Sequence, residues 1–365
     1  MPRDHQPIPL RPATDRSRLL YCADINALSD PDYLIEDFLP DQGVFIVYGQ
    51  PGSKKGFVVL DIALTVGALT ADEVKRGIKL PWHGRDVDHG AVVYVWSEGQ
   101  SGIKKRVTAW RQMRQRLHVG HSLAIIDTPV NLRDPASIDA LTEDVAETSD
   151  ALGLPVKLII LDTIARCSGN ANINAPGEMS ELVDGLERLK TKTGAVVLGV
   201  HHEGKEASRG MMGATTLKGA IDAEFKVTSD GQIVTVEGGK TKDDAPADLS
   251  FETRVVDVVD PVTRQPMLTK KGKRVTTLTL ETTDKPATRP SAPKLSDTQA
   301  NARQAFLNWL IDHEAKSMPL DQWTPVLTSG GIVDDRKRAK EVRDALDRKG
   351  LIRIEKEMIH VGREL

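Results

Sequence analysis

The residues with the clearest chemistry are in the stretch 43–62, GVFIVYGQPGSKKGFVVLDI. The run Val44–Tyr48 is rich in β-branched and aromatic residues and predicts a buried strand, and the apolar pattern of Phe57–Ala68 predicts a buried helix. A short polar loop that contains glycine joins them. A strand, a glycine loop and a helix in this order turn backbone N–H groups and a helix N-terminus toward a phosphate. The stretch therefore predicts a phosphate-binding loop.

The spacing within this loop follows the nucleotide-binding pattern of Gly, four residues, Gly-Lys and then Ser or Thr, but only in part. Gly49 and Lys55 hold the first glycine and the lysine positions. Lys54 replaces the second glycine, which is unfavourable if the backbone there needs a positive φ. Gly56 replaces the hydroxyl residue that normally ligates Mg²⁺, although water can take its place. The alternative is a structural turn between a strand and a helix.

The predicted nucleotide contacts come from the end of the strand, the whole loop and the first residues of the helix. They are Gly49, Gln50, Pro51, Gly52, Ser53, Lys54, Lys55, Gly56 and Phe57.

Polar residues also follow three other apolar runs that read as strands. Asp162 ends VKLIILD, the position from which a carboxylate holds Mg²⁺ through water in ATPases with such a loop. Glu98 follows AVVYVWS, where a carboxylate can orient and polarise an attacking water. His201 and His202 end LGVHH and suit a sensor of the γ-phosphate. A solvated acid or a hydrogen-bonded histidine pair is the alternative for each alone, but together with the loop they favour nucleotide hydrolysis.

The elements that must position these residues alternate between short apolar strands and longer helical patterns from residue 44 to about 282. This alternation predicts an α/β fold with a mainly parallel sheet, and β-hairpins are expected after Gly219. The expected strands are Val44–Tyr48, Ala91–Ser97, Leu123–Ile126, Lys157–Leu161, Ala195–His201, Glu224–Ser229, Gln232–Gly238, Leu249–Val258 and Thr276–Glu281. The expected helices include Phe57–Ala68, Ile103–Leu117, Pro135–Leu152 and Pro176–Thr193.

The 365-residue chain is longer than one typical domain. We expect a flexible N-terminal arm over 1–28, a nucleotide-binding core over 29–283 and a Pro/Ala/Ser/Lys linker over 284–296. Residues 297–365 read as three helices and a hairpin, which resembles a winged helix with Asp334–Lys349 as its recognition helix.

Composition narrows the class of protein. The net charge of −3 gives no overall nucleic-acid footprint, so any such binding must be local. The two cysteines, Cys22 and Cys167, offer neither a disulfide framework nor a metal cluster, as in a reducing compartment. No apolar run approaches the length of a bilayer helix. We therefore expect a soluble, cytoplasmic protein.

Residues 30–260 resemble the RepA-like ATPases, the RecA-type helicases of plasmids and prophages. The resemblance rests on the order of YGQPGSKKGFVVLDIAL, Trp82-x-Gly84 followed by GAVVYVWSEG, LIILDTIARCSGN, GAVVLGVHHEGKEASRGMMGATTLKGAIDAEF and GGKTKDD. It implies a RecA-like core and a homo-oligomeric ring, usually a hexamer. It also implies that ATP with Mg²⁺ is hydrolysed between subunits and that hydrolysis moves the ring along single-stranded DNA.

The resemblance also implies roles for individual residues. Glu98 is expected to activate water, Asp162 to lie on the metal side and His202 to sense the phosphate. Lys240 and Lys242 correspond to basic fingers that reach the neighbouring subunit's active site, where such a cation stabilises phosphoryl transfer.

Single-stranded DNA is expected to contact the segment 203–218, through Arg209 and Lys218. Duplex DNA is a second expected partner, at Arg338 and Arg343 of the C-terminal unit. Residues 336–349 hold seven basic and three acidic side chains, and a protein-docking module remains the alternative for this unit.

Two departures from the RepA-like pattern favour a weakened ATPase. One is Gly56, and the other is the triplet Asn172-Ile173-Asn174, where the family usually has Asp-Glu-Asn, with Glu178 a helical turn later. The rival interpretation is therefore a nucleotide-binding regulator or adaptor with impaired hydrolysis, which binds DNA or a replication protein through 297–365.

Overall fold

The computed structural model describes residues 32–97, 102–116, 122–169, 176–203, 214–241, 248–284 and 295–362. Glu98, Arg209, Lys242 and the triplet 172–174 lie outside these ranges, and for Lys240 and Thr241 the backbone alone is described.

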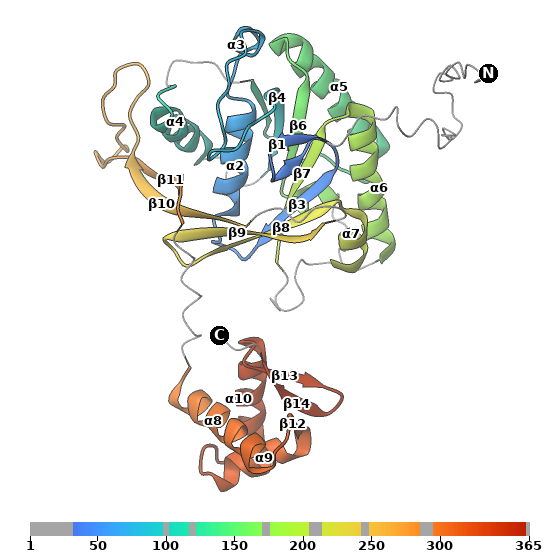
Figure 1. Cartoon of the computed structure of the whole chain (residues 1–365), viewed down its shortest axis with the longest axis vertical. Coiled ribbons are helices and arrows are strands. Elements are labelled where there is room, and N and C mark those ends of the chain that lie inside the picture. The colour runs from blue at the N-terminus through green and yellow to red at the C-terminus, as the bar shows by residue number, and fades with distance from the viewer. Residues whose placement is uncertain are drawn as a thin grey trace, which may run out of the picture. The chain divides into compact units, whose positions relative to one another are not determined.

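One large sheet organises the described part of residues 33–284, in the strand order β11-β10-β9-β8-β3-β7-β6-β4-β5 (Figure 1). The six strands from β8 to β5 in this order run parallel, and β9, β10 and β11 continue the sheet as antiparallel strands. The strands are β3 (Val44–Gly49), β4 (Ala91–Trp96), β5 (Leu123–Ile126), β6 (Val156–Asp162), β7 (Val196–His202), β8 (Ala223–Ser229), β9 (Ile233–Thr241), β10 (Leu249–Asp257) and β11 (Thr276–Thr282). This arrangement confirms the predicted α/β fold with a mainly parallel sheet.

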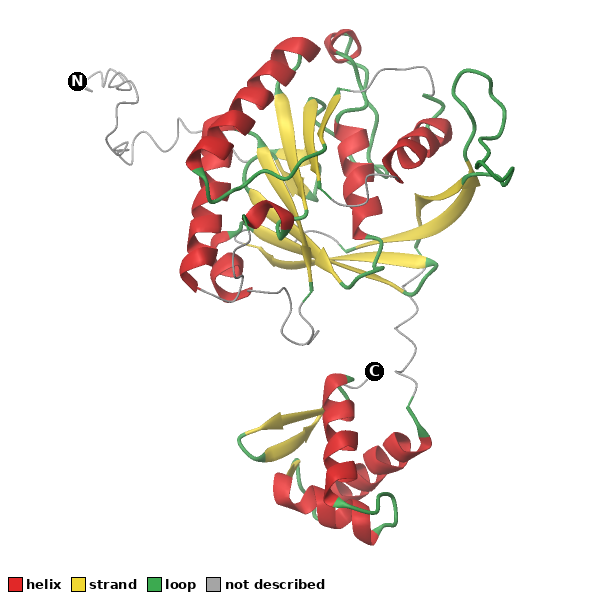
Figure 2. Cartoon of the chain, turned by 180° about the vertical axis from the view of Figure 1, so that it is seen from behind, coloured by secondary structure: helices red, strands yellow, loops and turns green. Residues whose placement is uncertain are grey.

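Helices cover both faces of the sheet (Figures 1 and 2). On one face α2 (Lys55–Val66) and α4 (Ile103–Met113) pack in a cluster that includes Leu158 and Ile160 of β6. On the other face α5 (Pro135–Leu152) and α6 (Pro176–Thr193) pack against Ile159 and Leu161. Because both of their faces are buried, the central parallel strands β3, β4, β6 and β7 are mostly continuous apolar runs, which made them visible in the sequence.

Several element boundaries differ from the prediction. The first helix begins at Lys55 rather than Phe57, and α4 ends at Met113 rather than Leu117 because Gln115 adopts a left-handed φ of 55°. Residues Ala214–Ala220 form helix α7, so the segment 203–218 is not a loop throughout.

The sequence analysis did not anticipate a few short elements. They are the hairpin β1 (Tyr33–Ile35) and β2 (Leu39–Pro40), helix α3 (Ala71–Lys75) and the 3₁₀ turn η2 (Arg166–Ser168).

Residues 295–362 form three helices and a three-stranded sheet of order β12-β14-β13. The elements are α8 (Asp297–Asp312), β12 (Ser317–Pro319), α9 (Leu320–Ser329), α10 (Arg336–Arg348), β13 (Ile352–Glu355) and β14 (Met358–Val361). They surround a separate hydrophobic cluster that includes Phe306, Trp323, Leu346 and Ile359. The Trp323 indole N–H donates to the Ala339 carbonyl at 2.9 Å and fixes α9 against α10. The predicted helix-helix-helix-hairpin order is present, with β12 as an additional strand.

Among the described residues, no helix has the length and apolar character that crossing a bilayer requires.

Candidate active site

The predicted phosphate loop lies between the end of β3 and the start of α2. At Gly49 a Cβ atom would lie 2.2 Å from the Val227 carbonyl oxygen, so only glycine fits there. Gly52 and Lys54 both have left-handed backbones, with φ of 84° and 70°. The Ser53 N–H donates to the Gln50 carbonyl at 3.1 Å, which closes the turn. The result is a tight loop that leads directly into a helix N-terminus, as phosphate binding requires.

The two lysines of the loop differ in position. Lys55 is the first residue of α2 and is only 8% exposed, and its Nζ lies 3.5 Å from the Gln50 carbonyl oxygen, folded over the loop. Lys54 is the N-cap residue of α2 and carries the positive φ that glycine adopts without strain. The replacement of the second glycine therefore has a conformational cost, and the lysine at position 55 is the one directed into the loop.

The parallel register places the other predicted groups on the same edge of the sheet. His202 at the end of β7 is the pairing partner of Gly49 in β3, and Asp162 at the end of β6 pairs with Val200 and with Trp96. Ligands of open α/β sheets bind at this carboxyl edge of the strands. Glu98 follows β4 but lies outside the described residues. The structure thus brings Lys55, His202 and Asp162 to one edge.

Asp162 is almost completely buried at the end of β6. Its Oδ2 accepts a hydrogen bond from the Tyr94 hydroxyl at 2.9 Å, and its backbone carbonyl accepts from Ser97 Oγ at 2.6 Å. Burial, and then the negative charge of Asp162, raise the pKa of Tyr94 well above its usual value. Tyr94 therefore remains a protonated donor that orients the carboxylate.

Arg106 is a member of this site that the sequence analysis missed. It comes from α4, and its Cζ lies 4.4 Å from the centre of the Phe57 ring and 5.8 Å from that of Trp96. Burial lowers the pKa of Arg106, and the charge of Asp162 acts in the opposite direction. No spacing motif connects Arg106 to the loop, because the contact joins two helices about 50 residues apart in the sequence.

The two histidines at the end of β7 have different environments. Leu198 and Val200 pack in the cluster that contains α2, and alternation along the strand puts His202 on that same face. His201 is fully buried, and its Nδ1 accepts the His202 backbone N–H at 2.7 Å, so its Nε2 carries the proton. Burial, followed by the charges of His202 and Lys55, lowers the pKa of His201 to about 4. His201 is therefore neutral at pH 7.

Three of the four side chains predicted to contact DNA have partners within the chain, and the fourth, Arg209, lies outside the described residues. Lys218 in α7 forms an ion pair with the buried Glu224 at 2.5 Å. In α10, Arg338 pairs with Glu341 and Arg343 with Asp344, each at 2.9 Å. Arg343 is only 17% exposed. A DNA phosphate would have to compete with these carboxylates.

The residues present fit a nucleotide phosphate better than they fit Mg²⁺. A typical site combines a hydroxyl at the start of the helix with a strand-end carboxylate, and here only Asp162 is present. One of its oxygens already accepts the Tyr94 hydrogen bond. Within the described ranges, no three His, Cys, Asp or Glu side chains gather as a metal site.

Comparison with known families agrees with this geometry. The sequence profile of the AAA domain family (AAA_25) matches residues 13–208, which is more than half of the 365 residues. No curated protein matches the chain. The matched region contains the phosphate loop, Asp162 and the β7 histidines, which together give the architecture of a nucleotide-dependent ATPase. The chain therefore belongs to the AAA domain family, with a RecA-like fold of the P-loop NTPase type.

Proposed function

We propose that this chain is an ATP-dependent DNA helicase of the RepA-like type that acts in plasmid or phage DNA replication. The observation that carries the proposal is the register of β3, β7 and β6, which lines up Lys55, His202 and Asp162 along one sheet edge. Backbone N–H groups of the loop and the Lys55 ammonium bind the β- and γ-phosphates of ATP. ATP is the cofactor in this proposal. The sequence also predicts Mg²⁺, with Asp162 as the residue that would hold it through water, but the described side chains fit a metal ion poorly.

Two groups act on the reacting γ-phosphate in this proposal. Glu98 orients the attacking water, and His202 contacts the phosphate and reports its release. Positioning and charge stabilisation account for most of the rate enhancement in phosphoryl transfer, so the rigid sheet edge is the important feature.

Assembly into a ring completes the site. Lys240 and Lys242 reach into the neighbouring subunit and stabilise the charge that develops during transfer. Single-stranded DNA passes the 203–218 segments with Arg209 and Lys218. These roles are supported by the RepA-like resemblance of the sequence.

The decisive experiment measures ATP hydrolysis with and without single-stranded DNA, on a sample whose mass in solution is known. We expect an oligomer and stimulated hydrolysis. Lys242→Ala lowers turnover per subunit with little change in ATP affinity, and added Lys55→Ala subunits, which still carry Lys242, restore part of it. A monomer in the presence of ATP and DNA, or a mixture without rescue, would contradict the helicase proposal.

A hydrolysis-impaired adaptor is a second candidate, and the residues at positions 54 and 56 favour it. A strained Lys54 and a missing hydroxyl at Gly56 are compatible with binding but unfavourable for rapid turnover. The adaptor binds ATP, shows no hydrolysis that DNA stimulates, and uses 297–365 to bind DNA or a replication protein.

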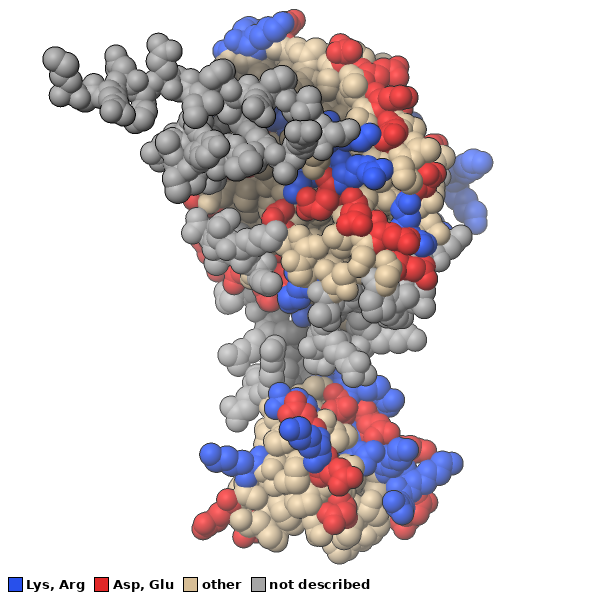
Figure 3. Space-filling model, turned by 90° about the vertical axis from the view of Figure 1, so that its right-hand side faces the viewer, with Lys and Arg blue, Asp and Glu red and all other residues tan. Residues whose placement is uncertain are grey.

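The surface of the C-terminal unit allows a test of DNA binding. Figure 3 shows basic and acidic side chains intermingled over the view of this unit. Removal of Arg338 and Arg343 together weakens duplex binding and flattens the salt dependence, by a slope of about 0.9 for each phosphate that the variant no longer neutralises. Both arginines pair with acids, so the same duplex-binding measurement is made after removal of the exposed Lys337 and Lys340, for comparison. No duplex affinity even at low salt would indicate a protein-docking module.

A further inference from the structure

We propose that the Arg106 guanidinium takes the place of the divalent cation at the phosphate loop, so that ATP binds to this chain without Mg²⁺. The inference rests on the proposed nucleotide binding, and it adds that an arginine side chain supplies the positive charge next to the phosphates. In proteins with Ser or Thr at the position of Gly56, the hydroxyl holds a metal ion. In this chain the hydroxyl is missing, and the nearby Arg106 would supply the positive charge in place of the metal ion.

The space next to Gly56 is open on the side of Arg106. Apart from its chain neighbours and the backbone of its own helix, a Cβ atom built on Gly56 would have one neighbour within 4 Å among the described residues, Arg106 Nη1 at 3.9 Å. A serine side chain therefore fits this position sterically. The side-chain group near the position of the usual metal-binding hydroxyl is thus the Arg106 guanidinium.

Aromatic contacts hold Arg106 in place without using its N–H donors. The guanidinium lies over the Phe57 ring at 4.4 Å, and Phe57 is the residue after Gly56. Trp96, at the end of β4, is a second aromatic contact at 5.8 Å. Such contacts orient the guanidinium plane without using its donors. Arg106 Nε is buried and has no hydrogen-bond partner within the described ranges, which points to a ligand with acceptor oxygens.

The charges around the site favour a phosphate over a metal ion as this partner. Asp162 attracts Arg106, and Tyr94 occupies one oxygen of the same carboxylate. A divalent cation beside Asp162 would therefore be repelled by the Arg106 guanidinium. One of the two carboxylate oxygens would also already accept a hydrogen bond. A planar guanidinium, by contrast, binds phosphate oxygens through two parallel N–H groups.

The test measures ATP binding to the full chain by calorimetry, once with excess MgCl₂ and once with EDTA. We expect the dissociation constant of the parent chain to differ less than about threefold between the two conditions, well below the tenfold that corresponds to one strong interaction. Arg106→Ala weakens binding in EDTA by about 10- to 100-fold, since it removes charge-assisted hydrogen bonds. Arg106→Lys, which keeps the charge but not the planar fork, is intermediate. Lys104→Ala removes an exposed cation from the same helix and leaves binding unchanged.

A second variant tests whether the metal site can be recovered. Arg106→Ala removes the competing cation, and Gly56→Ser in the same chain supplies the missing hydroxyl in open space. We expect this double variant to bind ATP at least about tenfold more tightly with MgCl₂ than with EDTA. In this background the same nucleotide thus becomes dependent on the metal ion.

The outcomes separate the inference from the function on which it rests. If the parent chain binds ATP with MgCl₂ and its affinity falls about tenfold or more in EDTA, nucleotide binding stands and the role of Arg106 is wrong. If the parent binds ATP in neither condition, both fail. The comparison of the parent in two buffers needs no substitution, so a poorly folded Arg106→Ala protein does not prevent the test.

Discussion

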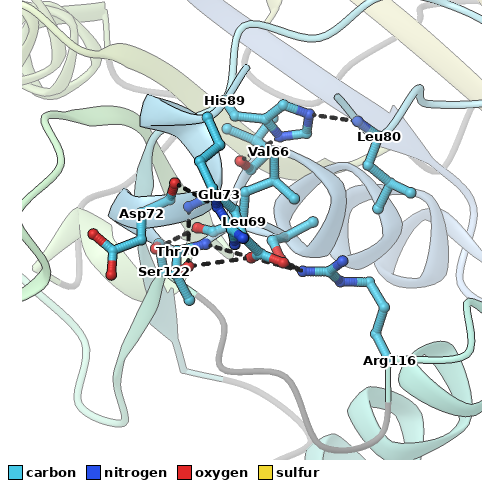
Figure 4. A network of polar contacts seen from close by, with 11 residues as sticks. Val66, Leu69, Thr70, Asp72, Glu73, Leu80, His89, Arg116 and Ser122 are labelled. Atoms are coloured by element: carbon cyan, nitrogen blue, oxygen red, sulfur yellow. Dashed lines mark hydrogen bonds and ion pairs between the residues drawn. The ribbon is translucent and has the colours of Figure 1, made fainter. Parts of the chain in front are cut away.

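The two edges of the central sheet use similar side chains in opposite ways. At the amino-terminal ends of β4 and β5, residues that precede these strands form a polar network around the end of α2 (Figure 4). Thr70 and Glu73 form a reciprocal capping box at the start of α3, and Arg116 donates to both Glu73 oxygens at 2.9 and 3.0 Å. Ser122 Oγ donates to the Leu69 carbonyl at 2.7 Å. Most polar side-chain groups of this network satisfy one another, although Arg116 Nε is buried without a partner within the described ranges. The network joins the end of α2, α3 and the strand starts.

At the carboxyl edge, polar atoms are buried without such partners. Ser53 Oγ, Trp96 Nε1, Arg106 Nε and His201 Nε2 have no hydrogen-bond partner within the described ranges. Buried polar groups are normally satisfied, so a group of exceptions around one loop indicates a place for a ligand. One edge therefore stabilises the fold, and the other is arranged to bind a nucleotide.

Two buried histidines, one at each edge, differ in how many of their ring nitrogens are hydrogen-bonded. His89, before β4, uses both ring nitrogens, because Nε2 accepts the Leu80 N–H at 3.0 Å and Nδ1 lies 3.2 Å from the Val66 carbonyl oxygen. Within the described ranges, His201 at the end of β7 uses only Nδ1, and its buried Nε2 has no partner there. The same residue type is thus structural at one edge and leaves a donor available at the other.

The largest expected effect is on binding at the carboxyl edge. Lys55→Ala removes an ammonium group that makes about two charge-assisted hydrogen bonds to phosphates, so ATP affinity falls at least about 1,000-fold, or about 4 kcal/mol. Thermal stability without ATP changes little. Calorimetric titration with ATP and a melting curve measure the two quantities. Equal ATP affinity of Lys55→Ala and the parent would remove the basis of the nucleotide site.

The pH dependence of stability tests the unsatisfied histidine. In the unfolded chain a histidine binds a proton below its ordinary pKa of 6.5, whereas burial keeps His201 neutral in the folded state down to about 4. Its contribution to stability is therefore complete above pH 6.5 and is lost as the pH falls toward 4. Over this window the decrease in stability is about 3 kcal/mol.

His201→Gln removes this titration and flattens the curve of unfolding free energy against pH by that amount. Denaturant titrations of the parent and the variant between pH 4 and 7 measure the difference. Parallel curves would mean that His201 is protonated equally in both states.

The sequence predicted the elements with local signals and missed contacts between distant segments. The bounds of α5 agree because Asp134 caps the Ala136 N–H, Pro135 opens the helix and Gly153 ends it in a left-handed conformation. The start of α2 was placed two residues late because its N-cap, Lys54, lacks a capping side chain. Arg106 reaches the loop only through the packing of α4 on α2, and no residue spacing records that packing.

At the opposite edge the expected effect is on stability. Glu73→Ala removes half of the capping box and the carboxylate that pairs with Arg116, whose side chain is 14% exposed. We expect the free energy of unfolding to fall by about 2 kcal/mol, and ATP affinity to stay the same. Asp72→Ala, an exposed acid in the same helical turn, is the matched control. A fall in the ATP affinity of Glu73→Ala with unchanged stability would abolish the distinction between the edges.

The smallest expected effect concerns the strained residue within the phosphate loop. Lys54 has a φ of 70°, which costs a non-glycine residue about 1–2 kcal/mol. Lys54→Gly relieves this strain but also gives the unfolded chain more freedom, so the expected net gain is about 0.5 kcal/mol of stability. ATP affinity is retained, because Lys55 rather than Lys54 is folded over the loop. Denaturant unfolding and ATP titration of the variant, with Lys54→Ala as the control that removes the charge but keeps the strain, separate conformation from charge. A fall in ATP affinity shared by both variants would show that Lys54 itself contacts the phosphates, and the carboxyl edge would then hold one more ligand-binding cation.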